Sequence, residues 1–127
     1  METLYLDTHA AVWLYAGEVD RFPARARRRL EASSLVISPM VLLEIQFLRE
    51  AGKVDIKPER FLREMKQDLD LALCQAAFTD IALAAVVLSW TRDPFDRLIV
   101  AQASAAEAPL LTRDKSILEH YSRAVWD

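Results

Sequence analysis

The chain has 127 residues, a formal net charge of −3 and a hydrophobic content of 53%. This length fits one domain with one hydrophobic core, and the apolar content excludes intrinsic disorder. Two glycines and a single cysteine exclude a collagen-like repeat, an internal disulfide and a cysteine-rich zinc cluster. The acidic balance excludes a polycation, so any nucleic-acid partner needs a local basic patch.

Short β-favouring segments alternate with longer helical patterns, which is typical of one α/β domain over residues 1–127. We predict strands at 3–6, 35–37, 110–112 and 124–126, and residues 69–73 are ambiguous. Helices are predicted at 9–16, 24–32, 39–51, 59–66, 79–88 and 94–106, and several follow a Ser, Thr, Asp or Pro that favours a helix start.

The N-terminal segment does not resemble a secretory signal, because Glu2 and Asp7 interrupt its apolar stretch and no basic leader precedes it. The longest apolar run, at 81–88, is shorter than the roughly 20 residues that cross a bilayer. We therefore expect a cytoplasmic protein without a membrane partner.

Four acidic residues lie where predicted strands end or predicted helices begin. Asp7 and Asp114 follow the first strand and the strand at 110–112. Glu44 lies in the second turn of one predicted helix, and Asp96 lies in the first turn of another. In a parallel α/β sheet such positions gather at one edge, so we expect folding to bring the four carboxylates together.

Glu44 is the most informative of these acids, because its helical neighbours are Met40, Val41, Phe47 and Leu48. An apolar stripe of this kind faces a core, where an unpaired carboxylate costs several kcal/mol. A shared divalent cation would compensate the charge. A glutamate that reaches solvent at the helix edge, or that pairs with a distant arginine, explains the pattern equally well.

Each of the other acids has a structural explanation too. Asp7 and Asp114 are placed to cap the helices that follow them, and Asp96 is placed to favour a helix dipole. Asp93 precedes Pro94 and is assigned the role of a cap alone.

A cluster of carboxylates repels itself unless a cation lies among them. Oxygen ligands, with few histidines and no set of thiolates, indicate Mg²⁺ or Mn²⁺ rather than zinc. Such an ion activates water and holds a phosphate oxygen, which is the chemistry that hydrolyses phosphodiesters.

The motifs resemble those of PIN-domain ribonucleases, and in particular the VapC toxins of bacterial type II toxin–antitoxin systems. The resemblance rests on Leu-Asp-Thr-His at 6–9, the helix from Pro39 to Glu44, Asp-Pro-Phe-Asp-Arg-Leu-Ile-Val-Ala-Gln-Ala at 93–103 and Leu-Leu-Thr-Arg-Asp at 110–114. It covers essentially the whole chain. It implies a three-layer α/β/α PIN-like fold with a short, mainly parallel central sheet.

The resemblance also implies a Mg²⁺-dependent endoribonuclease that cleaves RNA, often transfer or ribosomal RNA. By position, the catalytic and metal-binding acids would be Asp7, Glu44, Asp96 and Asp114, of which Asp7 and Asp96 would be the primary ligands. The supporting polar residues would be Thr8 and Thr112. Such toxins are usually homodimers, and a cognate antitoxin neutralises them by blocking the acidic groove.

An acidic protein needs local cations to hold RNA. We predict phosphate contacts from side chains that flank the acids, namely Arg92, Arg97, Arg113 and Lys115. Arg97 is also placed to orient the acids or to pair across a dimer. A further cluster, Arg25, Arg27, Arg28 and Arg29, is more simply interpreted as a solvated helix face or as intramolecular ion pairs. The aromatic residues Tyr5, Trp13 and Trp90 are expected to pack in the core or in a dimer.

Two other functions compete with the nuclease. Haloacid-dehalogenase-like phosphatases also place an aspartate after the first strand, but they need a second aspartate where this chain has His9. A non-catalytic dimeric module would use the acids to hold a structural cation or a basic peptide. Replacing Asp7 or Asp96 by asparagine distinguishes the nuclease from these alternatives, because loss of RNA cleavage with retained folding supports the nuclease.

Overall fold

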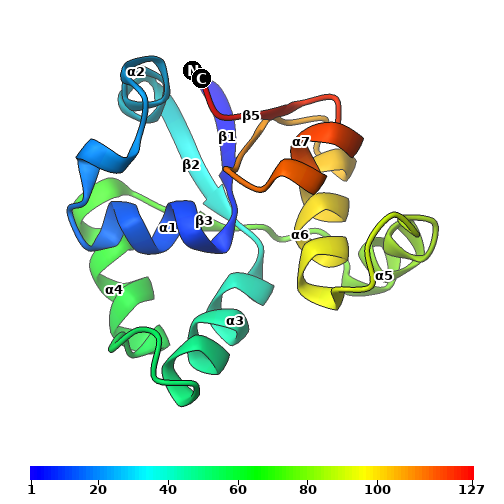
Figure 1. Cartoon of the computed structure of the whole chain (residues 1–127), viewed down its shortest axis with the longest axis horizontal. Coiled ribbons are helices and arrows are strands. Elements are labelled where there is room, and N and C mark those ends of the chain that lie inside the picture. Colours follow the sequence, from blue (N-terminus) through cyan, green and yellow to red (C-terminus); the bar gives the residue numbers. More distant parts are fainter.

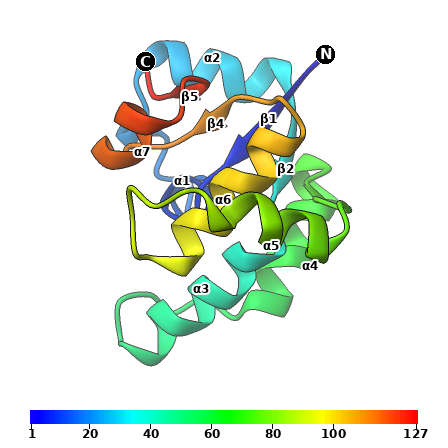
Figure 2. The ribbon, with the colours of Figure 1, turned by 90° about the vertical axis from the view of Figure 1, so that its right-hand side faces the viewer.

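The computed structural model describes all 127 residues and contains a five-stranded sheet between helices (Figures 1 and 2). The strands are β1 (Glu2–Leu6), β2 (Ser33–Ile37), β3 (Ala72–Leu73), β4 (Leu110–Leu111) and β5 (Ala124–Val125). The helices are α1 (Thr8–Tyr15), α2 (Ala24–Ala32), α3 (Pro39–Glu50), α4 (Pro58–Leu69), α5 (Phe78–Val86), α6 (Pro94–Ala105) and α7 (Lys115–His120), with a short 3-10 helix at Val19–Arg21.

The sheet is entirely parallel and has the strand order β3-β2-β1-β4-β5. In the register of the central strands, Tyr5 pairs with Val36 on one side and with Leu110 on the other. The chain moves outward from β1 to β3 and then returns to the other side of β1. The gap between β1 and β4 is therefore a topological switch point, where the carboxyl ends of parallel strands open a crevice.

Helices cover both faces of the sheet, which confirms the predicted three-layer arrangement. Figure 1 shows α1, α2 and α4 on one side of the strands and α5, α6 and α7 on the other. The remaining helix, α3, lies below the carboxyl ends of the central strands and packs against α1, α4 and α6. The side chains on α3 consequently face the crevice at that end of the sheet.

The core lies on both faces of β1. Leu4, Tyr5 and Leu6 are all nearly inaccessible to solvent, although they alternate between the two faces of the strand. This is expected for a parallel strand with helices on both sides. On α4, Phe61 and Met65 are buried one helical turn apart, as an amphipathic helix requires.

The predicted elements agree with the structure in type, with three differences. The ambiguous segment at 69–73 divides, because Leu69 ends α4, Asp70 adopts a left-handed conformation with φ 54°, and only Ala72–Leu73 pairs as a strand. The helix predicted at 79–88 spans Phe78–Val86. The short helix α7, which follows Asp114, is not among the predicted helix ranges.

The longest helices have 12 residues, and none is long and apolar enough to cross a membrane.

Candidate active site

A pocket of about 340 Å³ opens at the topological switch point and contains all four predicted acids. The acids reach it from four different segments, which are the turn after β1, the middle of α3, the first turn of α6 and the turn before α7. The pocket is lined by Asp7, Thr8, His9, Trp13, Glu44, Asp93, Asp96, Ile99, Arg113 and Asp114. Residues that lie far apart in the sequence therefore share one acidic pocket, and we call it the acid pocket.

Asp7 caps α1 and also lines the acid pocket. One carboxylate oxygen accepts a hydrogen bond from the backbone N–H of Ala10 at 2.9 Å and caps α1, while the other accepts one from the hydroxyl of Thr112. Asp7 is only 8% exposed, and its burial raises the pKa of its carboxyl group above the usual range. The cap fixes the carboxylate at the mouth of the crevice, so capping and participation in the site are compatible.

Glu44 is half-buried and accepts a hydrogen bond from the hydroxyl of Thr8. Burial raises its pKa, and the nearby charge of Asp93 adds to this effect. The apolar stripe around Glu44 faces the core only in part, because Phe47 is 52% exposed and Leu43 is 45% exposed, whereas Val41 is buried. The physical reason is that α3 lies across the end of the sheet and buries only one flank.

The pKa of Asp96, which is half-buried in the pocket, is also raised. Desolvation, followed by the charges of four other acids, raises the pKa of Asp96 to about 7; these acids are Asp93, Asp114, Glu44 and Asp7. None of the ion pairs in the structure involves a side chain of the acid pocket. The pocket therefore holds excess negative charge that no lysine or arginine neutralises within 4.0 Å.

Asp93 is a fifth acid in the pocket, where the sequence predicts only a cap. It does cap α6, because its carboxylate accepts hydrogen bonds from the backbone N–H groups of Phe95 at 2.8 Å and Asp96 at 3.3 Å. The sequence does contain one signal for this position, because Asp93 lies three residues before Asp96. An N-cap residue and the third residue of the same helix lie side by side at the helix start.

Asp114 is exposed and caps α7 by accepting from the backbone N–H of Ile117 at 3.1 Å. Its own N–H donates to the hydroxyl of Thr112 at 3.0 Å, and that hydroxyl in turn donates to Asp7. Thr112 is fully buried. A single threonine thus ties together the segments that carry two of the acids, while Thr8 holds a third.

Of the four predicted RNA contacts, only Arg113 lines the acid pocket. Its guanidinium lies 6.0 Å from the centre of the Trp13 ring. Arg97 instead donates from Nε to the backbone carbonyl of Thr91 at 2.8 Å, which anchors the segment before α6. Arg92 and Lys115 are exposed and lie outside the pocket wall.

The chemistry of the pocket fits a hard divalent cation. Five carboxylates and the hydroxyl of Thr8 line the pocket with oxygen atoms, and the mutual repulsion of the carboxylates favours a positive charge among them. No group of three or more histidine, cysteine, aspartate and glutamate side chains is placed so that it could hold a metal ion by itself. Mg²⁺ does not require such a set, because it usually keeps several waters and is held by one or two carboxylates.

The fold and the acidic crevice at its switch point place the chain in a defined class of protein. The PIN domain family matches residues 4–123, and the chain belongs to this family. Membership removes the phosphatase alternative. It also agrees with the three-layer parallel fold.

The chain is 28% identical over 123 residues to Ribonuclease VapC22 of Mycobacterium tuberculosis, covering 94% of this chain and 93% of that protein. Its fold is similar to a toxin–antitoxin complex from Klebsiella pneumoniae, with a TM-score of 0.67, 20% identity and 96% and 95% of the two chains covered. It is also similar to VapBC2 from Rickettsia felis bound to a promoter DNA fragment, with a TM-score of 0.64, 20% identity and 98% and 99% covered.

Proposed function

We propose that the chain is a Mg²⁺-dependent endoribonuclease that hydrolyses RNA phosphodiester bonds in the cytoplasm as the toxin of a type II toxin–antitoxin pair. The observation that carries the proposal is the acid pocket, where five carboxylates share one crevice and none of them forms an ion pair with a lysine or arginine. The similarity to Ribonuclease VapC22 over nearly the whole chain supports RNA as the substrate. Transfer or ribosomal RNA is the expected target.

Asp7 and Asp96 would hold the ion, with Glu44 and Asp114 as the further acids of the site. Mg²⁺, or Mn²⁺ in its place, would supply an activated water and charge stabilisation at phosphorus. Thr8 keeps the carboxylate of Glu44 oriented, and Thr112 does the same for Asp7. These hydrogen bonds hold the acids in place before substrate arrives, which limits the reorganisation needed during the reaction.

Purified chain, freed of any bound partner, should cleave total RNA in the presence of Mg²⁺ or Mn²⁺. EDTA should slow cleavage at least about 100-fold, because several kcal/mol of charge stabilisation are lost. Sequencing of the new RNA ends identifies the cleavage position. A partner-free preparation that binds Mg²⁺ yet leaves every RNA intact would contradict the nuclease and favour the non-catalytic module.

An antitoxin partner is part of the same proposal, because the structural neighbours are toxin–antitoxin complexes. An uncompensated acidic pocket also attracts a basic protein segment, which would exclude RNA from the site.

A homodimer is proposed from the exposed face of α5. Four large apolar side chains on and next to this helix are each between 66% and 76% exposed, namely Phe78, Leu83, Val86 and Val87. Several exposed apolar side chains on and next to one helix are typical of a protein interface. A second copy of the chain would cover it.

The double variant L83E/V87E should convert a dimer into a monomer in light scattering coupled to size exclusion, where one chain has a mass of 14.5 kDa. Two buried charges of like sign destabilise an apolar interface strongly. The control V19E alters an apolar side chain that is 46% exposed and lies away from α5, and it should leave the dimer intact. A parent protein that is monomeric would contradict this interface.

A further inference from the structure

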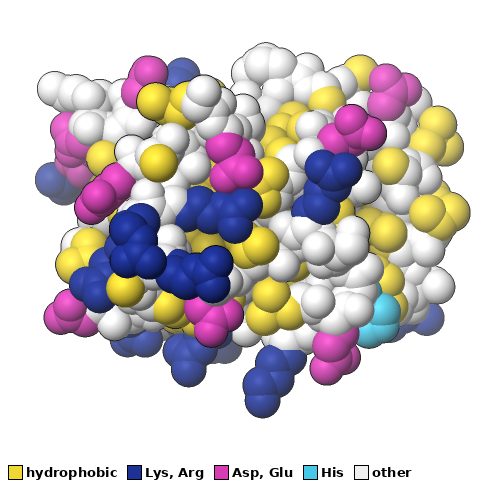
Figure 3. Space-filling view, turned by 90° about the horizontal axis from the view of Figure 1, so that it is seen from above, with side chains coloured by type: hydrophobic (Ala, Val, Ile, Leu, Met, Phe, Trp, Pro, Cys, Tyr) yellow, Lys and Arg dark blue, Asp and Glu magenta, His cyan; other side chains and the backbone are white.

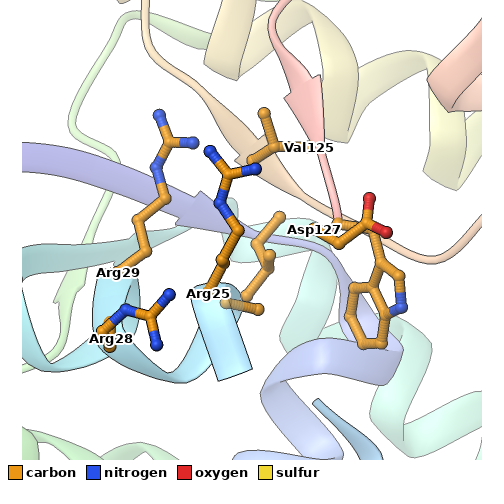
Figure 4. Close-up of a pocket in the computed structure, with 8 residues that line it drawn as sticks. Arg25, Arg28, Arg29, Val125 and Asp127 are labelled. Carbon is orange, nitrogen blue, oxygen red and sulfur yellow. The ribbon is translucent and has the colours of Figure 1, made fainter. Parts of the chain in front are cut away.

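A second hollow lies between α2 and the C-terminal strand, on the face seen from above in Figure 3. Its volume is about 230 Å³, and we call it the α2 groove. Figure 4 shows Arg25 and Arg29 extending from α2 toward Val125, with Asp127 on the opposite side. The groove is lined by Arg25, Ala26, Arg28, Arg29, Leu111, Val125, Trp126 and Asp127.

Two of the α2 arginines have no acidic partner. Arg25 and Arg28 are exposed and form no ion pair, whereas Arg29 pairs with Glu2 at 3.0 Å. Arg27 points away from the groove and lies 3.8 Å from Asp20. Of the two interpretations of this cluster, intramolecular ion pairs therefore describe Arg27 and Arg29, and a solvated helix face describes Arg25 and Arg28.

The charge inside the groove is consequently positive. The only acidic side chain in its wall is Asp127, against the two unpaired guanidinium groups of Arg25 and Arg28, since that of Arg29 is paired with Glu2. The space-filling view shows arginine and lysine side chains gathered on this side of the molecule (Figure 3). In a chain of net charge −3, such a local excess of positive charge favours a polyanion.

A pair of tryptophans separates the α2 groove from the acid pocket. Trp126 lines the groove and Trp13 lines the acid pocket, and their ring centres are 6.0 Å apart in an edge-to-face arrangement. Both rings are partly accessible. Arg113 lies beside Trp13, so positive charge continues from the pocket wall toward α2.

We propose that the α2 groove binds the phosphates of the RNA strand that occupies the acid pocket. The strand would pass over Trp13 and Trp126, and Arg25 and Arg28 would bind its phosphates. This inference rests on the proposed function. It explains how a negatively charged site retains a negatively charged substrate. The arginines that attract the strand are separated from the carboxylates that repel it only by Trp13 and Trp126.

Single-stranded RNA fits the groove better than an acidic protein segment does. Guanidinium groups match phosphate oxygens with two parallel hydrogen bonds, and exposed aromatic rings stack against bases. The groove offers guanidinium groups and the partly accessible ring of Trp126, whose centre lies 6.0 Å from that of Trp13 in the wall of the acid pocket. A peptide carboxylate would use only the first of them.

The double variant R25Q/R28Q tests the proposal through binding alone. Fluorescence anisotropy would use a labelled 30-nucleotide single-stranded RNA of mixed sequence, with D96N as the background that prevents cleavage. Each phosphate contact on a single strand contributes about 0.7 to the slope of log affinity against log salt. Loss of two contacts should reduce the slope by about 1.4 and weaken binding about 25-fold at 0.1 M salt.

The variant R27Q/R63Q is a matched control, because it removes the same net charge outside the groove. Its affinity should change less than about twofold. R25K/R28K keeps the charge and should retain most of the salt slope. Thermal unfolding of each variant confirms that the fold persists, which is expected because Arg25 and Arg28 are exposed and unpaired.

Equal loss of affinity in R25Q/R28Q and in the control would overturn the proposal, since net charge alone would then explain binding. Weaker binding of a poly-glutamate peptide without weaker RNA binding would overturn it in favour of an acidic protein partner. If the parent cleaves RNA and the α2 variant binds RNA normally, only this inference fails. If the parent cleaves none and the α2 variant still binds RNA more weakly, the proposed nuclease fails instead.

Discussion

Replacing Asp96 by asparagine should abolish RNA cleavage while it stabilises the metal-free protein. The amide cannot hold a divalent cation as a carboxylate does, so the cleavage rate should fall about 1,000-fold or more, equivalent to about 4 kcal/mol. The same change removes a half-buried charge that faces four other acids. We expect a gain of about 1 kcal/mol in unfolding free energy, or about 3–5 °C in Tm, at pH 8 in EDTA.

The gain in stability should depend on pH in a defined direction. Because the pKa of Asp96 is raised to about 7 in the folded protein, its proton is held more tightly in the folded state than in the unfolded one. The carboxylate therefore destabilises the fold progressively as pH rises from about 4 to 7. The advantage of D96N should vanish near pH 4 and reach its full value above pH 7.

D68N provides the matched control, since Asp68 is an exposed aspartate on α4 outside the acid pocket. Neither its cleavage rate nor its Tm should change measurably. Kinetics with labelled RNA and thermal unfolding from pH 4 to 8 measure both quantities. A D96N protein that cuts RNA at the parent rate would remove Asp96 from the active site.

The strand and helix pattern could be predicted because local signals agree with the tertiary fold. Asp7, Ser38 and Asp93 all cap the helices that follow them, as their positions before helical segments predict. The position of β3 could not be predicted, because its two residues become a strand only by pairing with Val36 and Ile37. Pairing of this kind depends on the whole sheet rather than on local preference.

The acid pocket was predictable as a gathering of residues at one sheet edge, but its local environment was not. The spacing of residues along α3 identifies Glu44 as an acid among apolar neighbours. The exposure of Phe47, however, depends on where this helix packs in the tertiary structure. The second role of Asp93 was hidden because a cap fully explains an aspartate before proline. The α2 groove was equally hidden, because which arginines lack partners depends on where Glu2 and Asp20 lie.

Mg²⁺ binding to the metal-free protein should strengthen as pH rises, and this is the sharpest test of the ion. A proton and the cation compete for Asp96, whose pKa is about 7, and burial also raises the pKa values of Asp7 and Glu44. The affinity should increase about tenfold per pH unit between pH 5 and 7 and become nearly constant above pH 8. Calorimetry without RNA measures this directly.

The same competition predicts that Mg²⁺ reverses the loss of stability at high pH. A concentration of 100 times the Kd adds about 2.7 kcal/mol to the free energy of unfolding. The Tm gain from a fixed Mg²⁺ concentration should therefore be large at pH 8 and small at pH 5, where the proton neutralises the pocket. D96N should show a weaker gain with a flatter pH profile, because the group whose pKa is raised to about 7 is gone. A Mg²⁺ affinity that does not change between pH 6 and 8 would mean that the cation binds away from Asp96. The acid pocket would then need another source of positive charge.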